Sequence, residues 1–251
     1  MPVDTDSAPG APGGADAPWV GLFSGGKDSS WALYRALEAG RPVERLVTVH
    51  PAGDSYMYHT PATELAALAA ESIGIQLLDV HPPAFGDGPP EDAGARGDAE
   101  LEPLEAALSD LREEWGRIGG VTAGAVESEF QTARMRAMCE RLGADLFAPL
   151  YGRAPAALAD AMLGAGFEIV VVAVAAQGLD ESWLGRRLDR DAFDELERLR
   201  EAHGVHPLGE GGEFETLVVD GPHMSRRIRI DADPVWEGTR GHLRIESARL
   251  D

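Results

Sequence analysis

The chain has 251 residues and 44% of them are hydrophobic, which is enough to form one large globular domain or two smaller ones. It carries 43 acidic residues against 22 lysines and arginines, so its formal net charge is −21. A surface this acidic repels phosphate backbones, which argues against direct binding of DNA or RNA. The composition is typical of proteins from a high-salt cytosol, and drift in a GC-rich genome is the alternative explanation.

Residues 1–18 are mostly Pro, Gly, Ala and Asp without periodicity, and they predict a disordered leader. The apolar run 19–23 predicts a strand. The segment Ser24-Gly25-Gly26-Lys27-Asp28-Ser29-Ser30 follows and precedes a helical pattern over 31–39. A glycine-rich turn between a strand and a helix directs backbone N–H groups and the positive end of the helix dipole at one point. This arrangement predicts a phosphate site.

Lys27 is the only lysine of the chain, whereas arginine occurs 21 times. A compact ammonium is therefore favoured here over a planar guanidinium. The spacing from Gly21 to Lys27 fits the Walker A pattern G-x-x-x-x-G-K-[ST], but Asp28 stands where that pattern requires Ser or Thr. The segment instead resembles the S-G-G-K-D-S loop of N-type ATP pyrophosphatases, which implies cleavage of ATP between the α and β phosphates.

Strands and helices alternate through the first part of the chain. Strands are predicted at 43–49, 75–80, 120–125 and 145–148, helices at 61–73, 101–115 and 129–142, and a mobile insertion at 82–100. This alternation predicts right-handed βαβ crossovers and an α/β fold with a parallel, doubly wound sheet. Ligands of such sheets bind at the carboxyl ends of the strands, so the loops near 24–30, 50–60 and 127 are expected to converge there.

After residue 150 the pattern changes. Helical segments at 155–163 and 191–202 flank an apolar run at 167–175, and three alternating runs follow at 213–219, 226–231 and 242–249. We expect a smaller C-terminal α+β domain at 151–251 that closes over the cleft of a nucleotide-binding domain at 19–150.

The stretch Glu127-Ser128-Glu129-Phe130-Gln131 follows a predicted strand and opens a helix. Ser128 and Gln131 fit a capping box, and the spacing alone favours that role. A carboxylate here would also face a nucleotide, and both roles are compatible.

A second acidic stretch runs from Gly209 to Thr216. On a strand, Glu213 and Glu215 point to the same face, and neighbouring carboxylates repel each other unless a cation lies between them. The glycines before them allow a ligand to approach closely. The pattern favours a functional site over an exposed acidic face.

The stretch 180–189 combines Trp183 with Arg186 and Arg187. The two arginines could pair with a phosphate or a carboxylate, and a surface turn is the alternative. The seven histidines show no spacing typical of a zinc site.

Cys139 is the only cysteine, which excludes a disulfide or a CxxC site within the chain. Its helical neighbours Met135, Met138 and Leu142 predict core packing for it. No apolar run reaches the roughly 18 residues of a membrane span, and the N-terminus has neither a basic nor an apolar signal region. We therefore expect a cytoplasmic protein without membrane contact.

Taken together, these stretches resemble the diphthine–ammonia ligase family, which performs the last step of diphthamide synthesis. The matching residues are Ser24–Ser29, Asp54–Thr60, Gly124–Gln131, Phe147–Arg153, Gly178–Asp189 and Gly209–Thr216. They span nearly the whole chain beyond the leader, and the last two stretches are more specific than the loop, which marks only the superfamily. The resemblance implies a sheet of the HUP type (adenine nucleotide alpha hydrolase-like).

The resemblance implies ATP-dependent amidation of diphthine, a modified histidine on translation elongation factor 2. ATP would adenylate the carboxylate, pyrophosphate would leave, and ammonia would attack the acyl-adenylate and release AMP. With Cys139 in a core there is no glutaminase nucleophile, so free ammonium is the expected donor. ATP and Mg²⁺ are the implied cofactors.

The same resemblance assigns residues to roles. Those assigned to the nucleotide are Ser24, Gly25, Gly26, Lys27, Asp28, Ser29, Ser30, Thr48, His50 and Glu127. Those assigned to the substrate are Tyr56, Tyr58, His59, Glu129, Trp183, Arg186, Arg187, Glu210, Gly211, Gly212, Glu213 and Glu215. Catalytic roles fall to Lys27, Asp28, Glu213 and Glu215, with Asp28 as the magnesium ligand.

Two other classes stay open on the sequence. Another N-type ATP pyrophosphatase could amidate a small carboxylate or modify tRNA, although the net charge of −21 and the lack of a cysteine pair weigh against tRNA. A non-catalytic nucleotide-binding module is the second alternative, and it has no need of paired acids in a second domain. A homo-oligomeric state is compatible with the sequence.

Overall fold

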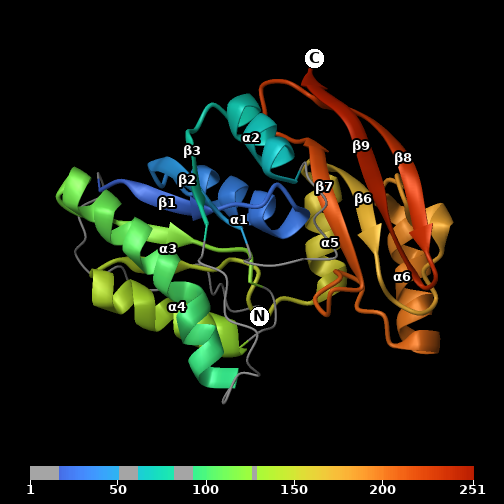
Figure 1. Ribbon diagram of the computed structural model, residues 1–251, viewed down its shortest axis with the longest axis horizontal. Coiled ribbons are helices and arrows are strands. Elements are labelled where there is room, and N and C mark those ends of the chain that lie inside the picture. The colour runs from blue at the N-terminus through green and yellow to red at the C-terminus, as the bar shows by residue number, and fades with distance from the viewer. Residues whose placement is uncertain (1–16, 51–61, 82–92, 126–128) are drawn as a thin grey trace, which may run out of the picture.

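The computed structural model describes residues 17–50, 62–81, 93–125 and 129–251 (Figure 1). The predicted leader therefore lies almost wholly outside the described residues, as do most of the 50–60 loop and residue Glu127. Across the described ranges, no helix combines the length and the apolar character that a bilayer crossing requires.

The first half of the chain forms a parallel sheet. Its strands are β1 (Trp19–Leu22), β2 (Val43–Val49), β3 (Leu77–Val80), β4 (Gly120–Thr122) and β5 (Asp145–Phe147). Helices α1 (Lys27–Glu38), α2 (Ala62–Ile73), α3 (Ala93–Trp115) and α4 (Glu129–Leu142) alternate with them. The strand order β3-β2-β1-β4-β5 confirms the predicted α/β, doubly wound fold. Strand order reverses between β1 and β4, and ligands of such sheets bind at that point.

Helices cover both faces of this sheet. Leu46 of β2 packs with Leu33 of α1 and Leu65 of α2 on one face. Val47, the next residue of β2, packs with Leu108 of α3 and Met138 of α4 on the other face. Consecutive strand residues point to opposite faces, so the adjacent apolar residues Leu46 and Val47 of β2 serve two cores at once.

The second half of the chain forms an antiparallel sheet of order β7-β6-β9-β8. Its strands are β6 (Glu168–Val174), β7 (Phe214–Asp220), β8 (Ile228–Glu237) and β9 (Arg240–Leu250), accompanied by helices α5 (Pro155–Gly164) and α6 (Arg190–His203) and by a short 3₁₀ helix, Glu181–Trp183. This sheet confirms the smaller C-terminal α+β part of the predicted fold.

The two sheets share a core. Val170 of β6 packs in the cluster that holds α1 and α2, while Ile169 and Val171 pack in the cluster that holds α5 and α6. The antiparallel sheet is therefore covered on one face by the helices of the first half and on the other by its own helices (Figure 1). This packing brings β7 against the N-terminus of α1.

Several element boundaries differ from the prediction. Helix α3 begins at Ala93, so the part of the predicted insertion from 93 to 100 is helical, and only 82–92 lies outside the described residues. Three alanines, one arginine and one glutamate favour a helix over these eight residues, about two turns, and the helix forms although Gly94 and Gly97 oppose it by about 1 kcal/mol each. Helix α1 begins at Lys27, not near Trp31, and β8 and β9 extend beyond the predicted runs because they form one long hairpin.

Candidate nucleotide-binding site

The predicted phosphate loop connects the carboxyl end of β1 to the N-terminus of α1. Gly25 has φ +80°, a left-handed conformation that glycine adopts without strain. The first helical hydrogen bond runs from the Ser30 N–H to the Gly26 carbonyl at 3.0 Å. The N–H groups of Asp28 and Ser29 belong to the first turn and have no acceptor within the helix. This end of α1 therefore presents amide donors and a positive dipole, as the sequence predicts.

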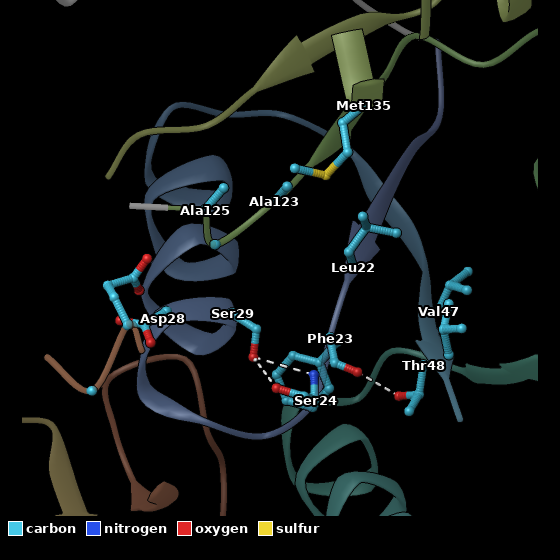
Figure 2. Close-up of a pocket in the computed structure, with 14 residues that line it drawn as sticks. Leu22, Phe23, Ser24, Asp28, Ser29, Val47, Thr48, Ala123, Ala125 and Met135 are labelled. Atoms are coloured by element: carbon cyan, nitrogen blue, oxygen red, sulfur yellow. Dashed lines mark hydrogen bonds between the residues drawn. The ribbon is translucent and has the colours of Figure 1, made fainter. Parts of the chain in front are cut away.

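Two serines brace the loop. Ser24 Oγ and Ser29 Oγ lie 3.2 Å apart, and the Ser24 N–H donates to Ser29 Oγ at 3.2 Å (Figure 2). Ser29 Oγ also donates to the Gly26 carbonyl at 3.1 Å. The hydroxyls that the sequence assigns to the phosphate thus hold the loop closed on itself, and a phosphate would compete for them.

Lys27 is 3% exposed and its ammonium lies among groups of the protein. Nζ donates to Asp28 Oδ2 at 2.7 Å and to the carbonyl oxygen of Leu208. It also lies 5.6 Å from the ring centroid of Phe214. Leu208 and Phe214 come from the second half of the chain, so the lysine of the loop joins both halves.

Asp28 fits the predicted magnesium site. One oxygen, Oδ2, is held by Lys27, while Oδ1 is buried and has no hydrogen-bond partner among the described residues. An orphaned, buried carboxylate oxygen beside a phosphate loop suits a hard cation that completes its shell with phosphate oxygens and water. Within the described ranges no cluster of three or more His, Cys, Asp or Glu could hold a metal by protein ligands alone.

A cavity of about 400 Å³ opens beside the loop. Figure 2 shows Ser24, Asp28 and Ser29 toward one side of it and Leu22, Val47 and Met135 toward the other. Its described lining consists of Leu22, Phe23, Ser24, Asp28, Ser29, Val47, Thr48, Val49, Ala123, Gly124, Ala125, Met135, Gly209 and Glu210. A polar end beside an apolar pocket suits phosphates followed by a sugar and a base.

The residues at the carboxyl end of β2 lie in two different environments. Thr48 lines the cavity, and its hydroxyl donates to the Phe23 carbonyl, which ties β2 to β1 (Figure 2). His50 lies toward β3, where its Nε2 is 2.8 Å from Asp79 Oδ1 and its ring stacks on His81 at 4.6 Å. The structure therefore brings Thr48 to the cavity and gives His50 partners elsewhere.

Gly124 lines the cavity and opens the matching stretch 124–131, but the sequence predicted no role of its own for it. A Cβ at this position would lie 2.6 Å from the carbonyl carbon of Asp28 and 2.7 Å from the Ser29 nitrogen. Only glycine permits this approach, because both neighbours are backbone atoms. The signal was a glycine inside the strand predicted at 120–125, which marks close backbone approach.

The acidic loop of the second half reaches the same cavity. Gly209 and Glu210 line it, so Glu210, which the resemblance assigns to the substrate, lies at the cavity beside the phosphate loop. The carboxylate of Glu213 instead accepts hydrogen bonds from the backbone N–H groups of His206 at 3.0 Å and Gly211 at 2.7 Å. Glu213 precedes β7 and closes its own loop, whereas Glu215 lies within β7 opposite Ala173.

The predicted pair of arginines has partners within the second half. Trp183 is 2% exposed in the core, and the Arg186 guanidinium lies 4.2 Å from the centroid of its ring. Arg186 also pairs with Glu195 at 2.8 Å, and Arg187 pairs with Glu168. None of the three is among the described residues that line the cavity, and their contacts favour the structural alternative.

The remaining assigned residues fall into two groups. Gly211 and Gly212 form the turn of the acidic loop, where the Gly212 N–H donates to the Gly209 carbonyl at 3.1 Å. The assigned residues outside the described part of the chain are Tyr56, Tyr58, His59 and Glu127, and the side chain of Glu129 is not described either.

Comparisons with known proteins agree with these features. The family profile of the diphthamide synthase N-terminal domain matches residues 19–146, and the profile of the C-terminal domain matches residues 154–250. A diphthine–ammonia ligase of Danio rerio is 35% identical over 234 residues, which cover 85% of this chain and 86% of that protein. One of Homo sapiens is 32% identical over 235 residues, with 85% and 83% covered. One of Schizosaccharomyces pombe is 30% identical over 229 residues, but the match covers only 38% of that longer protein.

Proposed function

The chain belongs to the diphthamide synthase family, and from that membership we propose its reaction in detail. The enzyme amidates the carboxylate of diphthine on translation elongation factor 2, consumes ATP and ammonium, and releases AMP and pyrophosphate. The observation that carries the proposal is the lysine-bearing loop at the β1 exit, which faces a cavity with a polar and an apolar end.

The loop chemistry supports transfer of the adenylyl group. A carboxylate oxygen of diphthine would attack the α phosphorus of ATP, and the bond between the α phosphorus and its bridging oxygen to the β phosphorus would break. Amides of the α1 N-terminus and the Lys27 ammonium stand where negative charge would grow on the leaving pyrophosphate. Ammonia would then attack the acyl carbon, and AMP would leave with the carboxylate oxygen.

Asp28 would hold Mg²⁺ through its orphaned Oδ1. When bound, the ion would neutralise charge on the phosphates of ATP. Asp28 meanwhile keeps its other oxygen on Lys27, so one carboxylate would orient both cations of the site.

Free ammonium is the proposed nitrogen donor. Cys139 is 1% exposed and packs with Met138 and Leu142 in the core beside α3 and α4, as the sequence predicts. Burial raises the pKa of its thiol to about 12, which is the opposite of an activated nucleophile. Glutamine is therefore not expected to support turnover of the pure enzyme.

We propose that residues 19–150 bind the nucleotide and that residues 151–251 bind the substrate protein. Glu210, which lines the cavity from the second half, supports this division. Glu215 on β7, together with Tyr56 and Tyr58, is proposed to contact the trimethylammonium of diphthine, since quaternary cations bind carboxylates and aromatic faces. An elongation factor as partner also implies a cytoplasmic enzyme.

The test is pyrophosphate release from ATP, measured with and without ammonium and with and without diphthine-bearing elongation factor 2. Release that requires all three supports the proposal. Release that depends instead on a small carboxylic acid selects another N-type ATP pyrophosphatase, and absence of release with retained ATP binding selects a nucleotide-binding module. ADP as product would contradict the proposal outright.

A further inference from the structure

Helix α1 begins without a side-chain cap of its own. Its N-cap residue is Gly26, and no side chain at that position accepts a hydrogen bond from the first turn. The first N–H groups of a helix lack intrahelical acceptors, and Ser, Thr, Asn or Asp at the N-cap usually supplies one. Because this helix end is also the phosphate loop, a capping acceptor must come from elsewhere or the loop frays.

Thr216 of β7 supplies that acceptor from the other half of the chain. Its Oγ1 accepts a hydrogen bond from the Lys27 N–H at 3.1 Å, although 189 positions separate the two residues. The contact continues along β7, where the Val218 N–H donates to the Gly25 carbonyl at 2.9 Å. A Cβ at Gly26 would lie 3.3 Å from the Thr216 carbonyl oxygen, so the strand lies directly against the loop.

The position of this cap selects which donors face a ligand. Thr216 occupies the amide of Lys27, while the amides of Asp28 and Ser29 stay without an acceptor inside the helix. The segment that leads into β7 carries the Leu208 carbonyl bound to Lys27 Nζ, and Glu210 at the cavity. The position of Thr216 against the phosphate loop therefore also determines where Glu210 lies in the cavity.

We propose that Thr216 is a positioning residue of the reaction. It caps α1 across the two halves, fixes the phosphate loop in its binding geometry and aligns the acidic loop with it. The inference rests on the proposed function, in that the loop is taken to bind ATP. It adds a residue with no predicted role and gives its hydroxyl a specific task.

Two substitutions separate the hydroxyl from the shape of the side chain. Thr216→Val keeps the branched form but removes the acceptor, and leaves the Lys27 amide unsatisfied. Thr216→Ser keeps the hydroxyl. We expect Thr216→Val to weaken ATP binding by about tenfold, measured by calorimetry, because the part-buried Lys27 amide loses its acceptor; tenfold corresponds to about 1.4 kcal/mol. Thr216→Ser should stay within about twofold of the wild type.

Hydrogen exchange gives a readout that does not need turnover. In Thr216→Val, amides of the peptide 21–30 should exchange faster than in the wild type, with or without ATP. Thr122→Val is the matched control, because Thr122 is buried and its hydroxyl also donates to α1, at the Ala32 carbonyl at 3.3 Å. That bond joins β4 to α1 beyond the first turn of the helix, so the control should lose stability without a change in ATP affinity or in exchange of 21–30.

The outcomes separate this inference from the proposed function. If wild-type protein bound no ATP, the proposed function would be wrong, and the exchange of peptide 21–30 would still decide whether Thr216 holds the loop. Wild-type affinity or tighter binding in Thr216→Val, with unchanged exchange, would overturn the inference. A loss of affinity in Thr216→Val that Thr216→Ser fails to restore would also contradict it, because packing and not the hydroxyl would then be responsible.

Discussion

The ammonium of Lys27 has acceptors within the protein itself. Burial of a charge is unfavourable unless acceptors compensate it, and here the Asp28 carboxylate and the Leu208 carbonyl do so. A phosphate that enters the loop would compete for the same N–H donors. Binding of ATP would therefore exchange the Leu208 carbonyl for a phosphate oxygen and free the acidic loop from this contact.

Lys27→Arg tests the need for a compact ammonium. Lys27 is 3% exposed, so there is little room for the larger, planar guanidinium. The new group would not fit in a position that pairs with both Asp28 and a phosphate. We expect pyrophosphate release to fall by at least about 100-fold, the usual loss when one charge-stabilising donor is displaced. Arg190→Lys, at an exposed ion pair with Asp160, is the control and should be as active as the wild type. Full activity of Lys27→Arg would show that the site does not need a compact ammonium.

His223 makes stability depend on pH. Both ring nitrogens are buried without hydrogen-bond partners among the described residues, and the ring stacks on Phe167 at 5.1 Å. Burial lowers the pKa of His223 from 6.5 to about 4. The unfolded chain therefore takes up a proton first as pH falls, so the free energy of unfolding decreases between pH 6.5 and about 4, by up to about 3 kcal/mol.

The variant His223→Phe isolates this effect from the titration of the carboxylates. A phenyl ring fits the aromatic surroundings of Phe167 and Tyr34 and takes up no proton. Urea unfolding at a series of pH values should show that the variant loses less stability than the wild type below pH 6.5 and behaves like it above. Parallel curves over the whole range would show that His223 does not titrate as stated.

The elements that the sequence predicted best are those with a strong pattern and clear ends. The prediction for β2 and α4 matches the observed bounds, because the apolar residues Val43, Leu46, Val47 and Val49 mark β2, and Gly143 directly follows Leu142, the last residue of α4. The prediction for α3 was wrong at its start. Its first turns contain glycines, and Pro103 lies inside the helix, so local preference argued for a later beginning.

Gly124 fixes how β4 approaches α1, and Gly124→Ala tests that approach. The added Cβ would lie 2.6 Å from a backbone atom of Asp28, so the strand end or the helix must shift. We expect a loss of about 1–3 kcal/mol in the free energy of unfolding and weaker ATP binding, since the shift displaces the first turn of α1. Gly164→Ala is the control: nothing lies within 4 Å of its Cβ, and stability should hold or rise slightly. Equal effects of both variants would show that the close approach is not specific.

At the scale of the whole molecule, the cavity is built from both halves of the chain. The loop at 24–30, its glycines and its lysine were predictable, because local spacing alone determines them. The cap from Thr216, the Leu208 carbonyl and the engagement of Glu213 within its own loop were not, since they depend on how the second sheet packs on α1. Trp183 and its neighbouring arginines were equally hard to place from local sequence. In the structure Trp183 is buried in the core, and Arg186 pairs with Glu195 of the same half.

The net charge of −21 gives the last prediction, which concerns the fold as a whole. Mutual repulsion of the excess carboxylates opposes the compact state. Salt weakens this repulsion, because the screening length falls from about 30 Å at 0.01 M to about 3 Å at 1 M. The exposed ion pairs, such as Arg244 with Asp233, are weakened too, but solvent-exposed pairs of this kind contribute little to stability.

We therefore expect the melting temperature to rise as KCl increases from about 0.01 M to 1 M, and to change less above that, where screening is nearly complete. Sucrose at matched osmolality is the control, because it leaves charge repulsion unscreened. A melting temperature that is independent of KCl, or that falls, would assign the acidic composition to sequence drift and not to adaptation of this fold to salt.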